Sequence, residues 1–412
     1  MTEGKKPTWC FPLGYKESFT IAIGLAATGI AIEIATKGAG FPSLHLPTNL
    51  IAGLLFIAIL LLLHFFFRKN LLVQWLSSTP AATSAISLFI LWALILAFVP
   101  QNSESGLSLS KVAGMSHITT SWQFTINLIF FLTVLGLTTI RRVAPLNFKS
   151  IGFFLNHAGL WLAVFAGSLG SGDMMRLKMY LKQNEVVWYA YDDKQQVHEL
   201  PIALKLNKFD IEEYAPKIAI VDNSTSKIAN NDQNNLIEIK DNVRSSKLGW
   251  TFFVKKYYNS AMPFEKDYQP IKTIGAAPAA YIEAFNIASN KKVEGWITCG
   301  SFMQPAKFFR LDEKISVAMS VPEPKRFYSD IQFYTKEGEI KQFTLEVNKP
   351  YKTNGWKLYQ ISYNEKMGKW SDTSVIELVK DPWLIAVYIG IFMLLAGAVY
   401  LFIIGGKIKH SL

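Results

Sequence analysis

Cysteine is scarce in this chain of 412 residues, which contains only Cys10 and Cys299. Neither cysteine begins a CxxC pair, so the sequence excludes a dithiol oxidoreductase. The CxxCH motif that attaches haem covalently is absent as well. Whatever the protein does, it has neither a dithiol redox pair nor a covalent haem of its own.

Charged residues are also few, at 18% of the chain, whereas 50% of the residues are hydrophobic. The apolar residues gather in long runs that are almost free of charge. Each run has about 20 residues, which is long enough to cross a bilayer as a helix. The sequence predicts about six transmembrane helices, over residues 17–36, 48–67, 82–99, 122–140, 151–170 and 383–404.

The positions of the basic residues predict the orientation, because Lys and Arg near the ends of spans favour the cytoplasmic side. The loops 37–47 and 100–121 contain only Lys37 and Lys111. The other span ends have the following basic residues: Lys5, Lys6, Lys16, Arg68, Lys69, Arg141, Arg142, Lys149, Lys407 and Lys409. We therefore expect both termini in the cytoplasm and residues 171–380 outside.

Two further expectations follow from this topology. The net charge is +11, from 42 Lys and Arg against 31 Asp and Glu. Much of the basic excess lies at span ends, where membrane topology and attraction to lipid headgroups account for it. No nucleic-acid partner is therefore predicted. Cys10 and Cys299 lie on opposite sides of the membrane and cannot pair, and we expect Cys299 to be a buried free thiol rather than bridged to another chain.

Short runs in which apolar and polar residues alternate begin after residue 171, and this period of two is typical of strands. Turn signals separate them at Glu337–Gly338 and Asn354–Gly355. The sequence predicts a mostly β external domain with an exposed loop at 222–235. Its single histidine, His198, is expected at the surface. The clearest strands are 199–209, 217–223, 248–258 and 339–347.

One ionisable residue interrupts the apolar run IGFFLNHAGLWLAV at 151–164, namely His157. On a helix it shares a face with Phe153, Phe154 and Trp161 at i−4, i−3 and i+4. A stripe of small residues, Gly152, Gly159 and Ala166, lies nearly opposite and allows close helix packing. An imidazole in a dry aromatic pocket suits an axial ligand to haem iron. A neutral histidine that hydrogen-bonds a neighbouring helix is an equal alternative.

The other candidates are weaker. His64 is close in depth to His157 but is followed by Arg68 and Lys69, which favours an interfacial role. His45 and His117 are expected to be exposed in outer loops. Glu33, near the outer end of the first span, can reach the interface, and we assign it no role.

From about residue 82 to 405 the chain resembles the ResB family, also called CcsB, of the system II pathway that attaches haem to c-type cytochromes. The resemblance begins with VPQ at 99–101, a span that opens SWQF at 121 and ends in a basic pair at 142, and NHAGLWLA at 156–163. After these come SDIQFY at 329–334, EVNKP at 346–350, GWKLYQISY at 355–363 and VKDPWLIAVYIG at 379–390. Their order and their spacing relative to the spans make the resemblance specific.

The predicted spans and strands together indicate an α+β membrane protein with about six transmembrane helices and a mostly β extracytoplasmic domain inserted before the last helix, and the resemblance covers four of the spans and this domain. Residues 1–81 would be a two-helix membrane segment outside the shared family core, and 82–170 a three-helix membrane core with His157. Residues 171–380 would be the external domain, and 381–412 the last helix with a short cytoplasmic tail. The membrane would be the bacterial inner membrane.

The resemblance also implies a function. ResB-like proteins work with a CcsA-like protein to move haem outward and present it to the CxxCH sites of apocytochrome c, and His157 matches the family's intramembrane haem ligand. The chain lacks the tryptophan-rich motif of the CcsA-like partner, which would be a separate chain, and a thioredoxin-like thiol reductant would act indirectly. The cofactor would be haem b in transit, ligated by His157, with Phe153, Phe154 and Trp161 as pocket residues and His64 as a weaker candidate.

No nucleophile or redox pair is present, so we expect a non-catalytic or co-catalytic subunit of a haem lyase (holocytochrome c synthase). Two other classes stay open: a membrane-anchored sensor with a ligand-binding ectodomain, and a structural subunit of a quinone-linked respiratory complex.

We also expect GWKLYQISY to be a strand, with Trp356 and Leu358 on one face and Tyr359 and Tyr363 on the other. Asp381 and Trp383 would follow below it, either coupling the domain to the haem path or anchoring the chain at the interface.

Overall fold

The computed structural model describes residues 9–101, 108–143, 150–232, 235–239 and 244–409. The chain divides into two compact units. The first, Met1–Met174 with Asp381–Leu412, is helical and is called the membrane unit here. The second, Met175–Lys380, is built of strands and is called the β unit. Of the basic residues used to predict orientation, Lys5, Lys6 and Lys149 lie outside the described residues.

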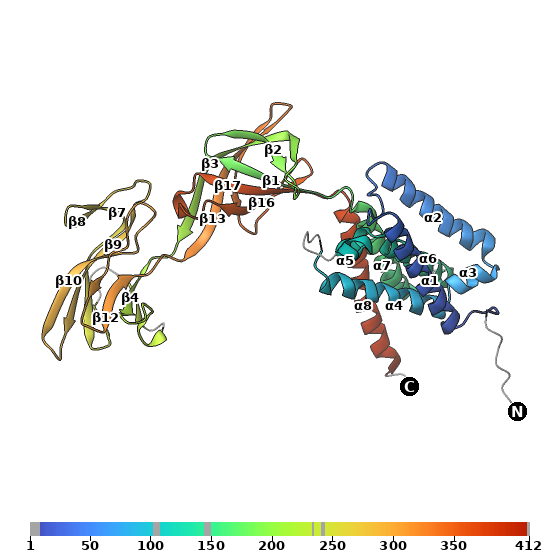
Figure 1. Cartoon of the computed structure of the whole chain (residues 1–412), viewed down its shortest axis with the longest axis horizontal. Helices are drawn as coiled ribbons and strands as arrows, with labels where there is room; N and C mark the ends of the chain where they lie inside the picture. Colours follow the sequence, from blue (N-terminus) through green and yellow to red (C-terminus); the bar gives the residue numbers. More distant parts are fainter. Residues whose placement is uncertain (1–8, 102–107, 144–149, 233–234, 240–243, 410–412) are drawn as a thin grey trace. The chain divides into compact units, whose positions relative to one another are not determined.

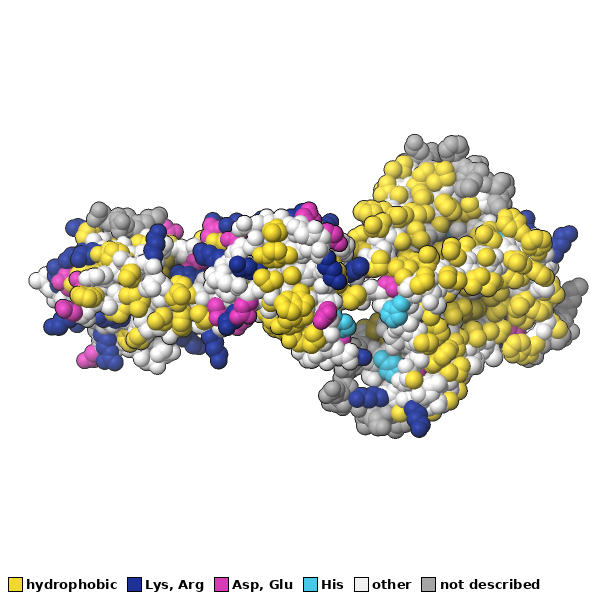
Figure 2. Space-filling model, turned by 90° about the horizontal axis from the view of Figure 1, so that it is seen from above, with side chains coloured by type: hydrophobic (Ala, Val, Ile, Leu, Met, Phe, Trp, Pro, Cys, Tyr) yellow, Lys and Arg dark blue, Asp and Glu magenta, His cyan; other side chains and the backbone are white. Residues whose placement is uncertain are grey.

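Six of the described helices are long and apolar enough to cross a membrane, as the sequence predicts. Hydrophobic side chains form large continuous areas on the visible face of this unit (Figure 2). The chain is therefore an α+β membrane protein. The membrane unit contains α1 (Tyr15–Ala35), α2 (Thr48–Phe67), α3 (Leu71–Leu76), α4 (Thr79–Phe98), α5 (Ser108–Val112), the 3₁₀ turn η1 (Met115–Thr120), α6 (Trp122–Val143), α7 (Ile151–Gly170) and α8 (Leu384–Lys409) (Figure 1).

The expected stripe of small residues on α7 packs against α8. A Cβ on Gly159 would lie 2.7 Å from the carbonyl oxygen of Gly390 and 2.8 Å from the amide nitrogen of Leu394, distances that no side chain tolerates. A Cβ on Gly152 would lie 2.7 Å from a side-chain carbon of Leu401, also on α8. Glycine therefore brings the two backbones into contact, the usual device for helix association in lipid. This leaves the opposite face of α7, which includes Trp161, to pack on α6.

The β unit is entirely antiparallel in its paired strands. One sheet of eight strands has the order β14-β13-β3-β2-β1-β17-β16-β15. Its strands are β1 (Met175–Lys182), β2 (Val186–Tyr191), β3 (Val197–Glu213), β13 (Pro324–Thr335), β14 (Ile340–Glu346), β15 (Tyr351–Thr353), β16 (Trp356–Tyr363) and β17 (Thr373–Lys380).

Two smaller sheets share a second hydrophobic core. The first contains β6 (Arg244–Lys247), β7 (Trp250–Phe264), β8 (Asp267–Pro270), β9 (Ala277–Asn286) and β10 (Lys291–Thr298). The second contains β4 (Lys217–Asp222), β5 (Leu236–Glu238), β11 (Phe309–Arg310) and β12 (Ile315–Met319). The side chains of Trp250, Phe252 and Ile220 are fully buried between them.

The topology of the β unit is a nested insertion. Its first and last strands pair along their whole length, with Met175 opposite Lys380. Within the large sheet, β3 and β13 pair from Ile202–Thr335 to Glu213–Pro324, and residues 214–323 form the two smaller sheets. Each part therefore begins and ends at neighbouring strands.

The predicted strands are confirmed, with one correction. The four clearest runs correspond to β3, β4, β7 and β14, and Asn354 and Gly355 both have positive φ in the tight turn between β15 and β16. In β16, Trp356 and Leu358 are buried as expected. Tyr363 is not on the opposite face: a bulge between Gln360 and Ser362 reverses the alternation, and its ring stacks on Phe209 at 4.9 Å.

The predicted loop at 222–235 is exposed at 224–227, 230 and 232, but Ala229 and Asn235 are buried, and residues 233 and 234 lie outside the described residues. His198 is partly exposed, and its Nε2 lies 3.1 Å from a carboxylate oxygen of Asp192.

Candidate functional site

His157 is held in one orientation by its own helix. Its Nδ1 lies 3.0 Å from the carbonyl oxygen of Phe153, one turn earlier on α7. Because a carbonyl only accepts, Nδ1 carries a proton, and in the neutral ring the lone pair is then on Nε2. Among the described residues, Nε2 has no hydrogen-bond partner. Histidines that bind metals commonly show this arrangement, with one ring N–H bonded to a carbonyl and the other nitrogen available.

Aromatic stacking supports the same orientation. The imidazole lies on the ring of Phe153 with 3.7 Å between the ring centroids and an interplanar angle of 23°. The guanidinium carbon of Arg142 lies 4.5 Å from the centroid of the same ring. A cation over an aromatic face is attracted by about 0.5–2 kcal/mol, depending on its hydration. Arg142, Phe153 and half-buried His157 thus form one cluster towards the end of the unit where α7 begins.

The other predicted pocket residues lie elsewhere or make fewer contacts. Trp161 points to α6, where its Nε1 donates a hydrogen bond to the carbonyl oxygen of Leu132 at 2.9 Å, and its ring stacks on Phe165 at 4.3 Å. Phe154 is half-buried on α7. His64 is buried on α2 with its ring edge-on to Phe65. Among the described residues, no hydrogen bond, ion pair or ring contact joins His64 to His157.

Glu33, to which the sequence assigned no role, bonds to several loop residues at the end of the helices away from His157. Glu33 on α1 is fully buried. It accepts hydrogen bonds from the backbone N–H of Gly40 at 3.0 Å and of Trp122 at 2.8 Å. His117 Nε2 lies 3.0 Å from the same carboxylate. The expectation that His117 is exposed is corrected, because its side chain is largely buried against Glu33. A carboxylate at the end of a span needs partners, and the loops next to it in space provide them here.

A second cluster that sequence reasoning missed centres on Asp173, directly after α7. Its carboxylate accepts hydrogen bonds from Leu46 N–H at 2.9 Å, Asn49 Nδ2 at 2.6 Å and Trp383 Nε1 at 2.7 Å. Exposed His45 lies 4.0 Å away. Burial raises the pKa of Asp173, but these hydrogen bonds and the nearby His45 lower the pKa by more, so the pKa lies below its usual value. Asp173 therefore ties the start of α2 and the start of α8 to the end of α7.

Cys299 in the β unit is a free thiol, as expected, but it is partly exposed rather than fully buried. Burial raises the pKa of this thiol to about 11. Because the thiolate is the reactive form, Cys299 is inert at neutral pH. Among the described residues, no group of three or more His, Cys, Asp or Glu side chains could hold a metal ion. The β unit therefore offers no described metal centre.

Residues 297–376 match the model of the ResB-like family. Over this segment the chain is similar to the ResB-like family. The matched segment runs from the end of β10 into β17 and includes SDIQFY, EVNKP and GWKLYQISY, the strings on which the resemblance rests most strongly. No curated protein matches the chain. The family suggests a function of the cytochrome c biogenesis type for this membrane-embedded protein, and His157 lies outside the matched segment.

Proposed function

We propose that this ResB-like protein is the haem-handling subunit of a system II cytochrome c synthase, and that His157 ligates haem iron within the membrane. The observation that carries the proposal is the state of the imidazole. Nδ1 is bonded to the Phe153 carbonyl, and Nε2 keeps its lone pair without a described partner. A histidine that served only to bridge two helices would use Nε2 for that bridge.

The surroundings of His157 suit haem b as the cargo. The ring is half-buried on a helix of the membrane unit, where water is scarce and a nitrogen donor can bind iron without competition. Phe153 keeps the imidazole plane fixed. Arg142 lies on the far side of Phe153 with its guanidinium exposed, and it can pair with a haem propionate, since Arg binds carboxylates in a two-pronged geometry.

The remaining functions of the synthase are divided between the β unit of this chain and partner proteins. A CcsA-like membrane protein would supply the second axial ligand, and the β unit would hold apocytochrome c on the outer face of a bacterial inner membrane, with both termini in the cytoplasm. A thioredoxin-like protein would keep the apocytochrome thiols reduced. This chain contributes binding and positioning, because joining a cysteine thiol to a haem vinyl group needs close approach rather than a nucleophile from this chain.

The test is replacement of His157 by glycine in cells that also express the CcsA-like partner. His157→Gly removes the nitrogen donor and leaves a space that free imidazole can fill, because iron needs the donor atom more than its link to the backbone. We expect folded protein that loses bound haem and cytochrome maturation, with both partly restored by added imidazole. The Soret band of the purified complex and haem staining of cytochromes measure this.

His64→Gly is the matched control, because it removes a histidine from another span of the same unit. We expect it to keep bound haem. If His64→Gly abolished haem and His157→Gly did not, the ligand would be on α2. If neither variant mattered, or if the purified complex showed no Soret band, the haem proposal would fail and a sensor would explain the chain better.

A further inference from the structure

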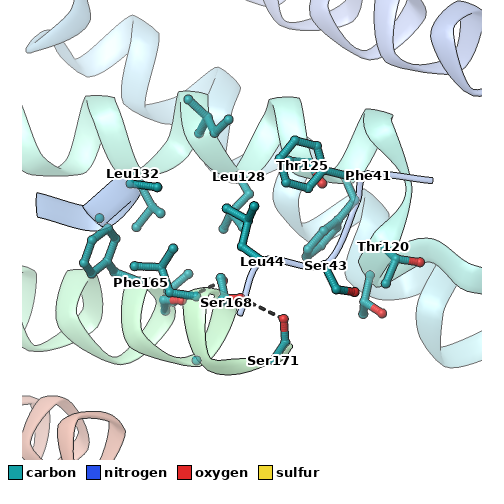
Figure 3. A pocket seen from close by; sticks show the side chains of 18 of the residues that line it. Phe41, Ser43, Leu44, Thr120, Thr125, Leu128, Leu132, Phe165, Ser168 and Ser171 are labelled. Atoms are coloured by element: carbon teal, nitrogen blue, oxygen red, sulfur yellow. Dashed lines mark hydrogen bonds between the residues drawn. The ribbon is translucent and has the colours of Figure 1, made fainter. Parts of the chain in front are cut away.

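A cavity of about 570 Å³ lies between α2, α6, α7 and the segment 41–44 of the membrane unit. It falls within the ordinary size range of small-molecule sites, about 300–1,000 Å³. In the view of Figure 3, the rings of Phe165 and Phe41 lie towards opposite ends, with Leu44 and Leu128 between them. His157 does not line it, so this cavity is separate from the proposed haem ligand.

The lining residues exclude several ligand classes. None of the residues that line the cavity is Lys, Arg, His, Asp or Glu, and none is Cys or Met. A carboxylate or phosphate would therefore find no cation there, and buried charges need partners. Haem iron would find no nitrogen or sulfur ligand. The cavity thus fits an uncharged ligand that is mainly apolar.

Six serine and threonine hydroxyls line the cavity, and four of them donate their protons to backbone carbonyls, Thr120 to that of His117 at 3.1 Å. Thr125 Oγ1 donates to the carbonyl oxygen of Ser121 at 3.0 Å, Ser168 Oγ to that of Val164 at 2.7 Å, and Ser171 Oγ to that of Ser168 at 2.8 Å. Such bonds to the preceding turn leave the oxygen lone pairs as acceptors. At these four positions a ligand that donates hydrogen bonds is therefore favoured over one that only accepts them.

The apolar part of the wall is aromatic. Phe56 and Phe165 stack with ring centroids 6.1 Å apart, and Phe41 and Phe124 also line the space. Aromatic side chains bind flat rings well, by offset or edge-on stacking. The cavity lies at the end of the unit where α2 and α6 begin and α7 ends, so a long apolar tail could extend along the helices towards the bilayer centre.

We propose that this cavity binds an isoprenoid quinol, an uncharged flat ring with hydroxyl donors and an apolar tail. At Thr125 and Ser168 the quinol form fits better than the quinone, because the quinone has only acceptors to offer to the lone pairs of these oxygens. A phospholipid acyl chain or a diacylglycerol lacks the ring that the aromatic wall favours. The proposal does not depend on the haem proposal.

The first experiment measures the binding of decylubiquinol and decylubiquinone to the full-length protein in phospholipid nanodiscs without oxygen. We expect saturable binding of the quinol and about fivefold weaker binding of the quinone, the difference expected for one lost hydrogen bond. Ala52→Phe adds a ring at a lining position and should weaken quinol binding at least tenfold. Ala58→Phe, at an exposed position of the same helix outside the cavity, is the matched control and should leave binding unchanged.

A second pair of variants keeps the test independent of any folding defect. Thr125→Val is nearly isosteric and should weaken quinol binding about fivefold while leaving quinone binding unchanged. Thr133→Val removes a hydroxyl with the same bond to the preceding turn, outside the cavity, and should change neither. Absence of saturable quinol binding, displacement by dioleoylglycerol at equal concentration, or binding unaffected by both Ala52→Phe and Thr125→Val would overturn the proposal. His157→Gly should keep quinol binding, so failure of the haem proposal would be separately visible.

Discussion

At the scale of single residues, the most informative contact joins Asp173 to Trp383, which are 210 positions apart in the chain. Either residue alone looks like an ordinary feature of a span end, a turn carboxylate or an interfacial tryptophan. Their hydrogen bond at 2.7 Å shows that Trp383 has a specific partner within the membrane unit. The interfacial-anchor interpretation of Trp383 is therefore incomplete.

Two substitutions of Trp383 distinguish the contribution of its aromatic ring to stability from that of its indole N–H. Trp383→Phe keeps an aromatic anchor but leaves a carboxylate oxygen of Asp173 without one donor, which should cost about 1–3 kcal/mol of unfolding free energy. Chemical unfolding in detergent measures this. Trp356→Phe, in the β unit and outside this network, is a comparison variant for a shortened tryptophan. If Trp383→Phe left stability unchanged and Trp383→Ala reduced only protein abundance, the anchor role alone would be sufficient.

Asp173 also predicts a dependence of stability on pH. Its folded-state pKa is lowered, so its contribution is complete above the unfolded value of 3.8 and is lost as the pH falls through the folded value. We expect the wild-type protein to lose stability below about pH 4. Asp173→Asn should be less stable at pH 7 and should show a smaller loss on acidification. Thermal unfolding at pH 3, 4, 5 and 7 would compare the two, and identical pH profiles would contradict the prediction.

At the scale of elements, the pairing of α7 with α8 depends on glycine at the contact. The stripe of small residues on α7 is visible in the sequence, and it predicts close packing but does not identify the partner. The structure identifies it as α8, because Gly390 and Gly397 provide matching small positions against Ala163 and Asn156. A partner more than 200 residues away cannot be deduced from a periodic pattern on one helix.

Gly159→Ala should separate these two helices. The new methyl group would lie 2.7 Å from a backbone oxygen of α8, so the helices must move apart, at a cost of about 1–3 kcal/mol. Gly24→Ala on α1 is the matched control, because nothing lies within 4 Å of its added Cβ. It should be neutral or should stabilise the protein by up to about 1 kcal/mol. Equal melting temperatures for the two variants would contradict the glycine-dependent packing.

The sequence allowed most elements to be predicted, but only some of the site. Long uncharged runs and alternating strands are local patterns, so the six spans and strands such as β3 and β7 are found without tertiary information. The bulge before Ser362 depends on pairing with β17, so the position of Tyr363 was wrong. His157 could be singled out because an imidazole is rare in an apolar run. The carboxylate of Glu33 gives a similar signal, but its partners come from distant loops.

At the scale of the whole molecule, the surface chemistry of the two units differs. Hydrophobic side chains cover the membrane unit, whereas Lys, Arg, Asp and Glu are interspersed over the β unit (Figure 2). Many of these charges form ion pairs, such as Lys255 with Glu283 and Glu294. The β unit therefore presents a surface suited to water, consistent with its proposed position outside the membrane.

The proposed orientation can be tested with a single introduced cysteine. Lys336 is exposed in the turn between β13 and β14, so Lys336→Cys should react with a membrane-impermeant maleimide in intact cells once the outer membrane is made permeable. Native Cys10 is exposed and is the internal control, since it should react only after lysis. Partly exposed Cys299, whose thiol has a raised pKa, should react much more slowly than either exposed thiol. Labelling of Cys10 before lysis, without labelling of the introduced thiol, would reverse the topology.

The pairing of Met175 with Lys380 makes the β unit a removable module. Residues opposite each other in antiparallel strands have Cα atoms about 5 Å apart, so a linker of a few residues could close the gap after excision. What would remain is a plain helical hairpin of α7 and α8, still joined by their glycine contact and by the bond from Trp383 to Asp173. The same holds one level down, where residues 214–323 begin and end beside the Glu213–Pro324 pair. The gene segment that encodes the β unit, or residues 214–323 within it, could therefore be inserted or exchanged while the α7–α8 hairpin, with His157, stays intact.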